Sequence, residues 1–168
     1  MAREHRFRAI HVPEPRQAGL ARMLLSTKGD YGVRAMIDLA KHEGEGPVQR
    51  AEVARRRQIP ESYLDHLLAQ LRRAGFIRSV RGPGGGHLLA RPAEDICLLH
   101  VLEALEGSLA PLACLETREP DQEAICGQEW VWQEIYDDMR RKLASVSVAD
   151  LVEHERVHER ERVVNYSI

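Results

Sequence analysis

A glycine-rich run at residues 81–86, RGPGGG, constrains the fold more than any other feature of this 168-residue chain. Two short β-like runs flank it, FIRSV at 76–80 and GHLLA at 86–90. Glycine readily adopts the positive φ values that a tight hairpin tip requires, so the run predicts a β-hairpin. A nucleotide site is disfavoured, because a dinucleotide motif needs a helix after its glycines and a P-loop needs Gly-Lys-Ser/Thr. Neither pattern follows here.

Three helical patterns precede the hairpin. Residues 26–44 and 60–76 repeat apolar side chains at helical spacing, and residues 47–60 contain a shorter helix that ends before Pro60. The stripe of the third helix consists of Leu64, Leu67, Leu68 and Leu71. Two helices joined by a tight turn form a helix-turn-helix, and the hairpin after them would be its wing. The sequence therefore predicts a mainly α fold, with a winged helix-turn-helix domain over residues 23–92.

The second half of the chain combines a linker with a long amphipathic helix. Residues 93–125 are predicted to hold a linker helix at 94–107 and then a cysteine-containing sensor loop. The buried side of the linker helix is marked by Leu98, Val101, Leu102 and Leu105. Residues 126–168 are predicted to form a long helix over 126–146 and a tail that frays after a short final helix. Apolar residues recur along the long helix at Val131, Ile135, Met139 and Leu143, with Trp130, Trp132 and Tyr136 beside them. A small winged helix has little core to cover such a face, so we expect a homodimer joined by this helix.

Residues 1–22 show no clean hydrophobic period. We expect a flexible N-terminal extension there, or an upstream start-site artefact in which Met23 is the first native residue. The chain has three cysteines, no secretory signal and no apolar run long enough to span a bilayer. An odd number of cysteines suits a reducing compartment, so we predict a cytoplasmic protein without a membrane partner.

Charge is unevenly distributed, although the formal net charge is only −2. Residues 50–91 carry nine arginines and three acidic residues, a net charge of +6. Residues 92–168 carry seven basic and seventeen acidic residues, a net charge of −10, and residues 1–49 carry eight and six, a net charge of +2. A basic middle segment predicts a local surface for a polyanion, with a merely solvated charged face as the alternative.

The third helix and the hairpin contain the candidate DNA contacts. A recognition helix reads bases with residues near its N-terminus, which makes Ser62, Asp65 and His66 the candidate base contacts. Side chains suited to phosphates are Lys28, Tyr63, Arg72, Arg73 and Arg81. The small residues Gly82, Gly84 and Gly85 would let the hairpin backbone approach a phosphate or enter a minor groove. A hairpin turn without a ligand is the alternative for the wing.

Three segments of the sequence resemble the Rrf2 family of bacterial transcription factors: MLLSTKGDYGVRAMIDLA, IPESYLDHLLAQLRRAGFIRSVRGPGGGHLLARP and SVADLVE. The resemblance covers about residues 23–153. It implies a homodimeric winged helix with a long crossed dimerisation helix, bound to palindromic operator DNA. Family members sense iron–sulfur clusters, nitric oxide or cysteine.

The resemblance also implies a candidate cluster site, from which this chain departs. Many family members hold a 2Fe-2S or 4Fe-4S cluster with three cysteines and one other ligand. Cys114 and Cys126 match the first and third cysteines, but Pro120 stands at the middle position. Glu129 stands where one relative has a histidine ligand, and Asp30 where another draws an aspartate from the partner subunit. A 2Fe-2S cluster on these four residues, a zinc site, a thiol switch and a regulator without a cluster all stay open.

We therefore predict a dimeric DNA-binding repressor on a palindromic operator, responsive to an iron–sulfur or redox signal. The alternatives are a clusterless regulator that responds through a thiol switch or a protein partner, and a winged-helix interaction module without an operator. An enzyme is disfavoured, because no plausible acid–base pair accompanies the glycines. Cys97 is predicted to be a core residue within a helix. His154 and His158 are predicted to lie on a solvated face, with metal binding as the alternative.

Overall fold

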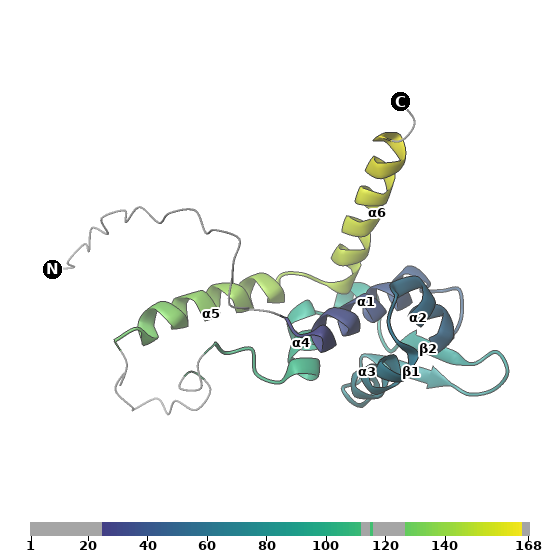
Figure 1. Ribbon diagram of the computed structural model, residues 1–168, viewed down its shortest axis with the longest axis horizontal. Helices are drawn as coiled ribbons and strands as arrows, with labels where there is room; N and C mark the ends of the chain where they lie inside the picture. The colour runs from purple at the N-terminus through teal and green to yellow at the C-terminus, as the bar shows by residue number, and fades with distance from the viewer. Residues whose placement is uncertain (1–24, 112–114, 116–126, 166–168) are drawn as a thin grey trace.

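The computed structural model describes residues 25–111, 115 and 127–165, so the predicted extension at residues 1–22 lies outside it. Its helices are α1 Thr27–Lys41, α2 Arg50–Arg57, α3 Glu61–Arg73, the 3-10 turn η1 Ala93–Asp95, α4 Leu98–Glu106, α5 Glu129–Ala144 and α6 Val148–Asn165. The strands β1 Ile77–Val80 and β2 Gly86–Leu89 form an antiparallel hairpin. Helices α1 to α4 and the hairpin make one body, from which α5 and α6 extend in different directions (Figure 1). The predicted winged helix-turn-helix is confirmed.

The helix-turn-helix is shaped by signals at the ends of α2 and α3. Gln58 adopts a left-handed φ of 54° and ends α2. Pro60 stands directly before α3, where a missing backbone N–H costs no helical hydrogen bond. The short turn directs the stripe of α3 into the core, where Leu64, Leu67, Leu68 and Leu71 are buried as predicted. The opposite side of α3 is thereby turned to solvent.

Helix α1 approaches α4 closely because two of its positions are glycine. A Cβ at Gly32 would collide with the side chain of Leu105, and a Cβ at Gly29 would collide with Glu106. The space at Gly29 lets Glu106 Oε1 accept hydrogen bonds from Gly29 N at 2.9 Å and from Ser26 Oγ at 2.6 Å. The Glu106 carboxylate therefore caps the positive end of α1 and ties it to the end of α4.

The hairpin is anchored to the body by a third extended segment. Its register pairs Ile77 with Leu89 and Val80 with Gly86. Gly82 takes a φ of 110° at the tip, and its carbonyl accepts a hydrogen bond from Gly85 N at 2.9 Å. Val48, in the loop before α2, exchanges two backbone hydrogen bonds with His87, of 2.9 and 2.8 Å. A Cβ at Gly86 would collide with the Val48 carbonyl, so this close approach requires glycine.

The predicted linker helix is wrong at its start. Helix α4 begins only at Leu98, because η1 and an extended stretch replace its first turn. The extended stretch pairs with the turn between α5 and α6: Leu98 N donates to Val146 O and Val148 N donates to Ile96 O, both at 2.9 Å. As a result Leu99, and not Leu98, lies on the buried side of α4.

The C-terminal helix is longer than predicted, because α6 continues to Asn165 where a fraying tail was expected. Val148 and Val152 bury its first turns against the body. Beyond them Lys41 of α1 forms ion pairs with Glu155 at 2.9 Å and with Glu159 at 2.7 Å. Contacts with α1, which no local pattern reveals, extend the helix.

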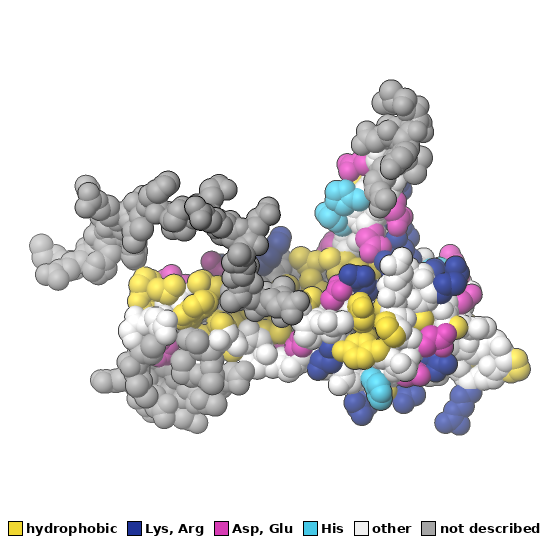
Figure 2. Space-filling view, in the orientation of Figure 1, with side chains coloured by type: hydrophobic (Ala, Val, Ile, Leu, Met, Phe, Trp, Pro, Cys, Tyr) yellow, Lys and Arg dark blue, Asp and Glu magenta, His cyan; other side chains and the backbone are white. Residues whose placement is uncertain are grey.

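Helix α5 leaves apolar side chains exposed, and Glu129 is its one buried residue. Trp130, Val131 and Ile135 are 52%, 36% and 38% exposed. Its other side is tied to α4 by an ion pair of 2.9 Å between Arg140 and Glu103. In the space-filling view, hydrophobic side chains lie open along the part of the molecule that α5 forms (Figure 2). None of the described helices combines the length and apolar character needed to cross a membrane.

Candidate nucleic-acid interface

The solvent side of α3 carries the polar side chains that were predicted to read bases. Ser62, Asp65 and His66 are all exposed in the first two turns of the helix. A recognition helix contacts base edges in the major groove with this part of its length. A carboxylate accepts a hydrogen bond from cytosine N4, and a hydroxyl can bond to several base edges. The face therefore has the chemistry for base recognition, while the contacts themselves stay predictions.

Arg50, which no sequence pattern identified, holds the Asp65 carboxylate. Its guanidinium donates two hydrogen bonds to Asp65, of 2.8 and 2.7 Å, and lies 3.3 Å from Glu61. The hydrogen bond to Asp65 is the main reason that the pKa of Arg50 is raised above its ordinary value. Arg50 starts α2 whereas Asp65 lies in α3, so only the helix-turn-helix geometry joins them. The pair orients a candidate base contact and offsets its negative charge.

The start of α1 lies against α3. The rings of Tyr31 and Tyr63 meet edge to face, with centroids 5.9 Å apart and planes at 80°. Arg34 lies 5.7 Å from the Tyr31 ring and forms an ion pair of 2.8 Å with Asp30. Lys28, a candidate phosphate contact, stands in the first turn of the same helix and is half-buried. Tyr63 is therefore positioned by packing on α1.

Four arginines border the end of α3 and the wing. Arg72 and Arg73 end α3, Arg78 lies in β1 and Arg81 follows it. All four are exposed, and none forms an ion pair within the residues that the structure describes. Lys and Arg side chains project from the lower edge of the body, beneath α3 and the hairpin (Figure 2). Arginines without carboxylate partners are suited to phosphate contacts.

The glycines of the wing do not all serve one purpose. The positions of a Cβ at Gly82 and Gly84 are open space, so the backbone at the tip is accessible. A Cβ at Gly85 would collide with the carbonyl of Val80, so the turn itself requires this glycine.

Behind the tip, burial and the positive charge of Arg72 lower the pKa of His87 from its ordinary value.

A group of charged residues, here called the clamp, joins α1 and α2 to α6. Asp38 is 2% exposed and accepts hydrogen bonds from Arg56 at 2.7 Å and from Arg57 at 3.2 Å. Arg57 also donates to Glu155 of α6 at 2.9 and 3.0 Å, and Lys41 pairs with the same carboxylate. Burial alone would raise the pKa of Glu155, but hydrogen bonds from Lys41 and Arg57 hold it below its ordinary value. The clamp thus links the helix-turn-helix to the segment that follows α5.

The predicted cluster ligands are only partly within the described residues. Cys114 and Cys126 lie outside them. Glu129 is 4% exposed at the first position of α5, and Asp30 is paired with Arg34 of its own chain. Within the described stretches no three potential metal ligands cluster. The four-residue site therefore stays a prediction.

The third cysteine cannot complete that site within its own chain. Cys97, which is half-buried before α4 and not within a helix, lies 3.8 and 3.6 Å from the carbonyl oxygens of Leu143 and Ala144. Those carbonyls belong to the end of α5, whereas Glu129 begins this 16-residue helix. At 1.5 Å per residue the two ends are about 22 Å apart. Within one chain, a cluster next to Glu129 could therefore draw thiolates only from Cys114 and Cys126.

Comparison with known proteins agrees with this geometry. The family model Rrf2, described as an iron-dependent transcriptional regulator, matches residues 25–154. The transcriptional regulator IscR of Photorhabdus laumondii is 39% identical over 136 residues, covering 80% of this chain and 82% of that protein.

Two solved structures are also similar. CymR, the global cysteine regulator of B. subtilis, has a TM-score of 0.67 at 34% identity, covering 78% of this chain and 97% of that one. IscR of T. potens has a TM-score of 0.67 at 39% identity, covering 79% of this chain and 88% of that one. The family and these relatives are transcriptional regulators and not enzymes.

Proposed function

The chain belongs to the Rrf2 family of transcriptional regulators, and from this premise we propose that it is a homodimeric repressor of a palindromic operator. Its partner is double-stranded DNA, and its place is the cytoplasm. The observation that carries the proposal is the exposed polar face of α3 beside four arginines that lack acidic partners among the described residues. Each chain inserts α3 into a major groove, and the wing contacts the backbone or the minor groove.

A second copy of the chain supplies the other half of the DNA-binding surface. Val131 and Ile135 lie exposed on the side of α5 that α4 does not cover, which supports an isologous contact between two α5 helices. A two-fold dimer would place its recognition helices about 34–36 Å apart, or a multiple of that spacing. The operator would then repeat its half-sites with the same symmetry.

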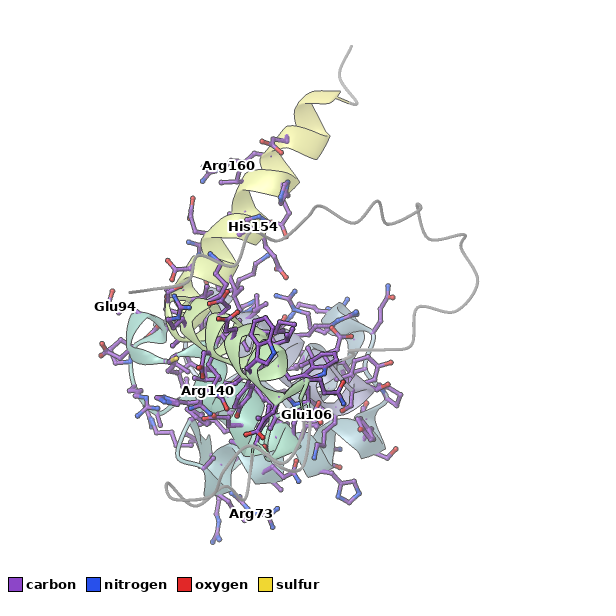
Figure 3. All side chains as sticks on the ribbon, turned by 90° about the vertical axis from the view of Figure 1, so that its left-hand side faces the viewer. Arg73, Glu94, Glu106, Arg140, His154 and Arg160 are labelled. Atoms are coloured by element: carbon purple, nitrogen blue, oxygen red, sulfur yellow. The ribbon has the colours of Figure 1, made fainter. Side chains whose placement is uncertain are left out.

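The proposal is tested with an operator selected from a random duplex library. Affinity is measured by fluorescence anisotropy over a range of salt concentrations. Arg73→Ala should weaken binding to the operator and to unrelated duplexes alike, and should reduce the salt slope by about one. His66→Ala should weaken binding to the operator more than binding to unrelated duplexes. Arg160→Ala is the matched control, because Arg160 projects from α6 at the end of the molecule opposite Arg73 (Figure 3).

Failure has a clear form. A library that yields no preferred duplex, with binding independent of salt, would favour the interaction module without an operator. Repression itself is measured by transcription from a promoter that carries the selected operator. Transcription that rises when the protein is added would make the chain an activator.

We also propose that the signal is a 2Fe-2S cluster held by Cys114, Cys126 and Glu129, with Asp30 of the partner subunit as the fourth ligand. The family description as iron-dependent and the burial of Glu129 three residues after Cys126 support this ligand set. When bound, such a cluster supplies a redox-sensitive group next to α5. The residues themselves hold and position it, and Asp30 must first exchange its partner Arg34.

Iron content and visible absorption of protein purified without oxygen test the cluster. We expect about two irons per chain, lost in Cys114→Ala/Cys126→Ala and kept in Cys97→Ala. Colourless, iron-free protein that still binds its operator would remove the cluster and leave a thiol switch or a protein partner as the signal. A zinc content of one per chain would identify a zinc site.

A further inference from the structure

Two histidines and a glutamate gather on an exposed side of α6. His154, His158 and Glu161 are all exposed. A neighbouring side of the helix is the one that docks, through Glu155 and Glu159. Histidine side chains stand open to solvent on this part of α6 (Figure 2). The contacts that attach α6 to the body therefore do not explain the histidine side.

The two imidazole rings converge through the same ring nitrogen. Nε2 of His154 lies 3.3 Å from Nε2 of His158. Two imidazole nitrogens bound to one tetrahedral ion stand about 3.3–3.4 Å apart, because each Zn–N bond is about 2.0–2.1 Å. The spacing of four residues allows this approach, since such residues share one side of a helix. The two Nε2 atoms are therefore as far apart as two ligands of a single ion.

The carboxylate of Glu161 completes the arrangement behind one ring. Its Oε2 lies 3.1 Å from Nδ1 of His158, the nitrogen that does not face His154. In metal sites a ligating histidine almost always donates its second N–H to a carboxylate, a carbonyl or water. This bond fixes the tautomer with a lone pair on Nε2, which is the form that binds a metal.

We propose that His154 and His158 bind a divalent transition-metal ion of the zinc type, with Glu161 as the orienting residue. Imidazole nitrogen suits zinc, copper and nickel, whereas magnesium and calcium prefer oxygen ligands. Water or an exogenous ligand fills the remaining positions, since no third protein ligand joins the pair among the described residues. A plain hydrogen bond between the two rings would explain the same distance without a metal, and the experiment below separates the two.

The site is distinct from both surfaces described above. His154 lies on α6 at one end of the molecule and Arg73 lies at the other (Figure 3). The pair also stands apart from the start of α5, where Glu129 is a candidate cluster ligand. The inference therefore does not depend on the proposed DNA-binding function or on the cluster.

Zinc binding is measured by isothermal titration calorimetry with Zn²⁺ as the probe. The parent is the full chain with Cys114→Ser and Cys126→Ser, because thiolates would otherwise compete for the ion. Three variants are compared in this parent: His154→Ala, His158→Ala and Glu161→Gln. His100→Ala, at an exposed histidine of α4, is the matched control.

We expect the parent and the His100→Ala control to bind one more Zn²⁺ per chain than His154→Ala and His158→Ala bind. Glu161→Gln should keep the site but weaken it about tenfold, because the orienting carboxylate is lost. Circular dichroism of each variant should match that of the parent. Equal Zn²⁺ binding by the parent and both histidine variants would overturn the proposal and leave a hydrogen bond between the rings.

Discussion

Helices α3 and α5 each carry a stripe of apolar side chains, but the two stripes differ greatly in burial. The stripe of α3 lies wholly inside the body, where Leu64 and Leu71 are each 0% exposed. On α5, Val131 and Ile135 are 36% and 38% exposed. An apolar face stabilises the fold only when it is removed from water. The stripe of α3 is buried within one chain, whereas that of α5 is not. The difference supports the proposal that a second chain covers α5.

The largest expected effect is the loss of stability caused by a cavity in the core around α3. Leu64→Ala removes a fully buried side chain between α3 and its neighbours. It should lower the free energy of unfolding by about 3–5 kcal/mol. Urea denaturation followed by circular dichroism measures the loss, which should not change with protein concentration. A loss below 1 kcal/mol would show that the core of the single chain is not well packed.

The next largest effect should come from a charge on the uncovered face of α5. Ile135→Glu would bury an unpaired carboxylate between two α5 helices, at a cost of about 2–4 kcal/mol. The dimer dissociation constant, measured by sedimentation, should therefore rise about 30- to 1000-fold. Val157→Glu is the matched control, since Val157 on α6 is similarly exposed at 41%. Equal weakening by both variants, or by neither, would place the dimer contact elsewhere.

The same comparison explains what could be predicted from the sequence. The leucine stripe and the glycine-rich wing were predicted correctly because period and turn chemistry act within one element. The start of α4 and the length of α6 were not, since they depend on pairing with Val146 and on ion pairs with Lys41. These partners are far away in the chain, and only the folded geometry joins them. Candidate base contacts were assigned from their position in the helix. Arg50, which holds Asp65, was missed because only the folded geometry brings α2 and α3 together.

A smaller effect, on operator affinity, should come from breaking the ion pair between Arg50 of α2 and Asp65 of α3. Arg50→Ala leaves the Asp65 carboxylate without its partner next to the DNA phosphates. Operator affinity should fall about tenfold, as anisotropy would measure. In a double-mutant cycle, Asp65→Ala should then add little, with a coupling of about 1 kcal/mol. Strictly additive effects would show that the pair does not act together in DNA binding.

The smallest effect on stability should come from the clamp, which joins α6 to α1 and α2. Glu155→Gln removes a carboxylate that accepts hydrogen bonds from Arg57 and Lys41. We expect a loss of about 1 kcal/mol of unfolding free energy at neutral pH, because these groups are partly exposed. Glu153→Gln is the control, since Glu153 is exposed and forms a single long ion pair among the described residues, with Arg156 at 4.0 Å.

The pH dependence of the stability of Glu155→Gln tests whether the charge of the Glu155 carboxylate attaches α6 to the body. Because the pKa of Glu155 in the folded protein is lowered below the ordinary value of 4.5, its contribution is present above that value. The contribution is lost as the pH falls through the lower, folded pKa. The difference in urea midpoint between the parent and Glu155→Gln should therefore be constant from pH 7 to about pH 5 and shrink below about pH 4.5. A difference that stays constant down to pH 3 would mean that the carboxylate charge does not hold α6 in place.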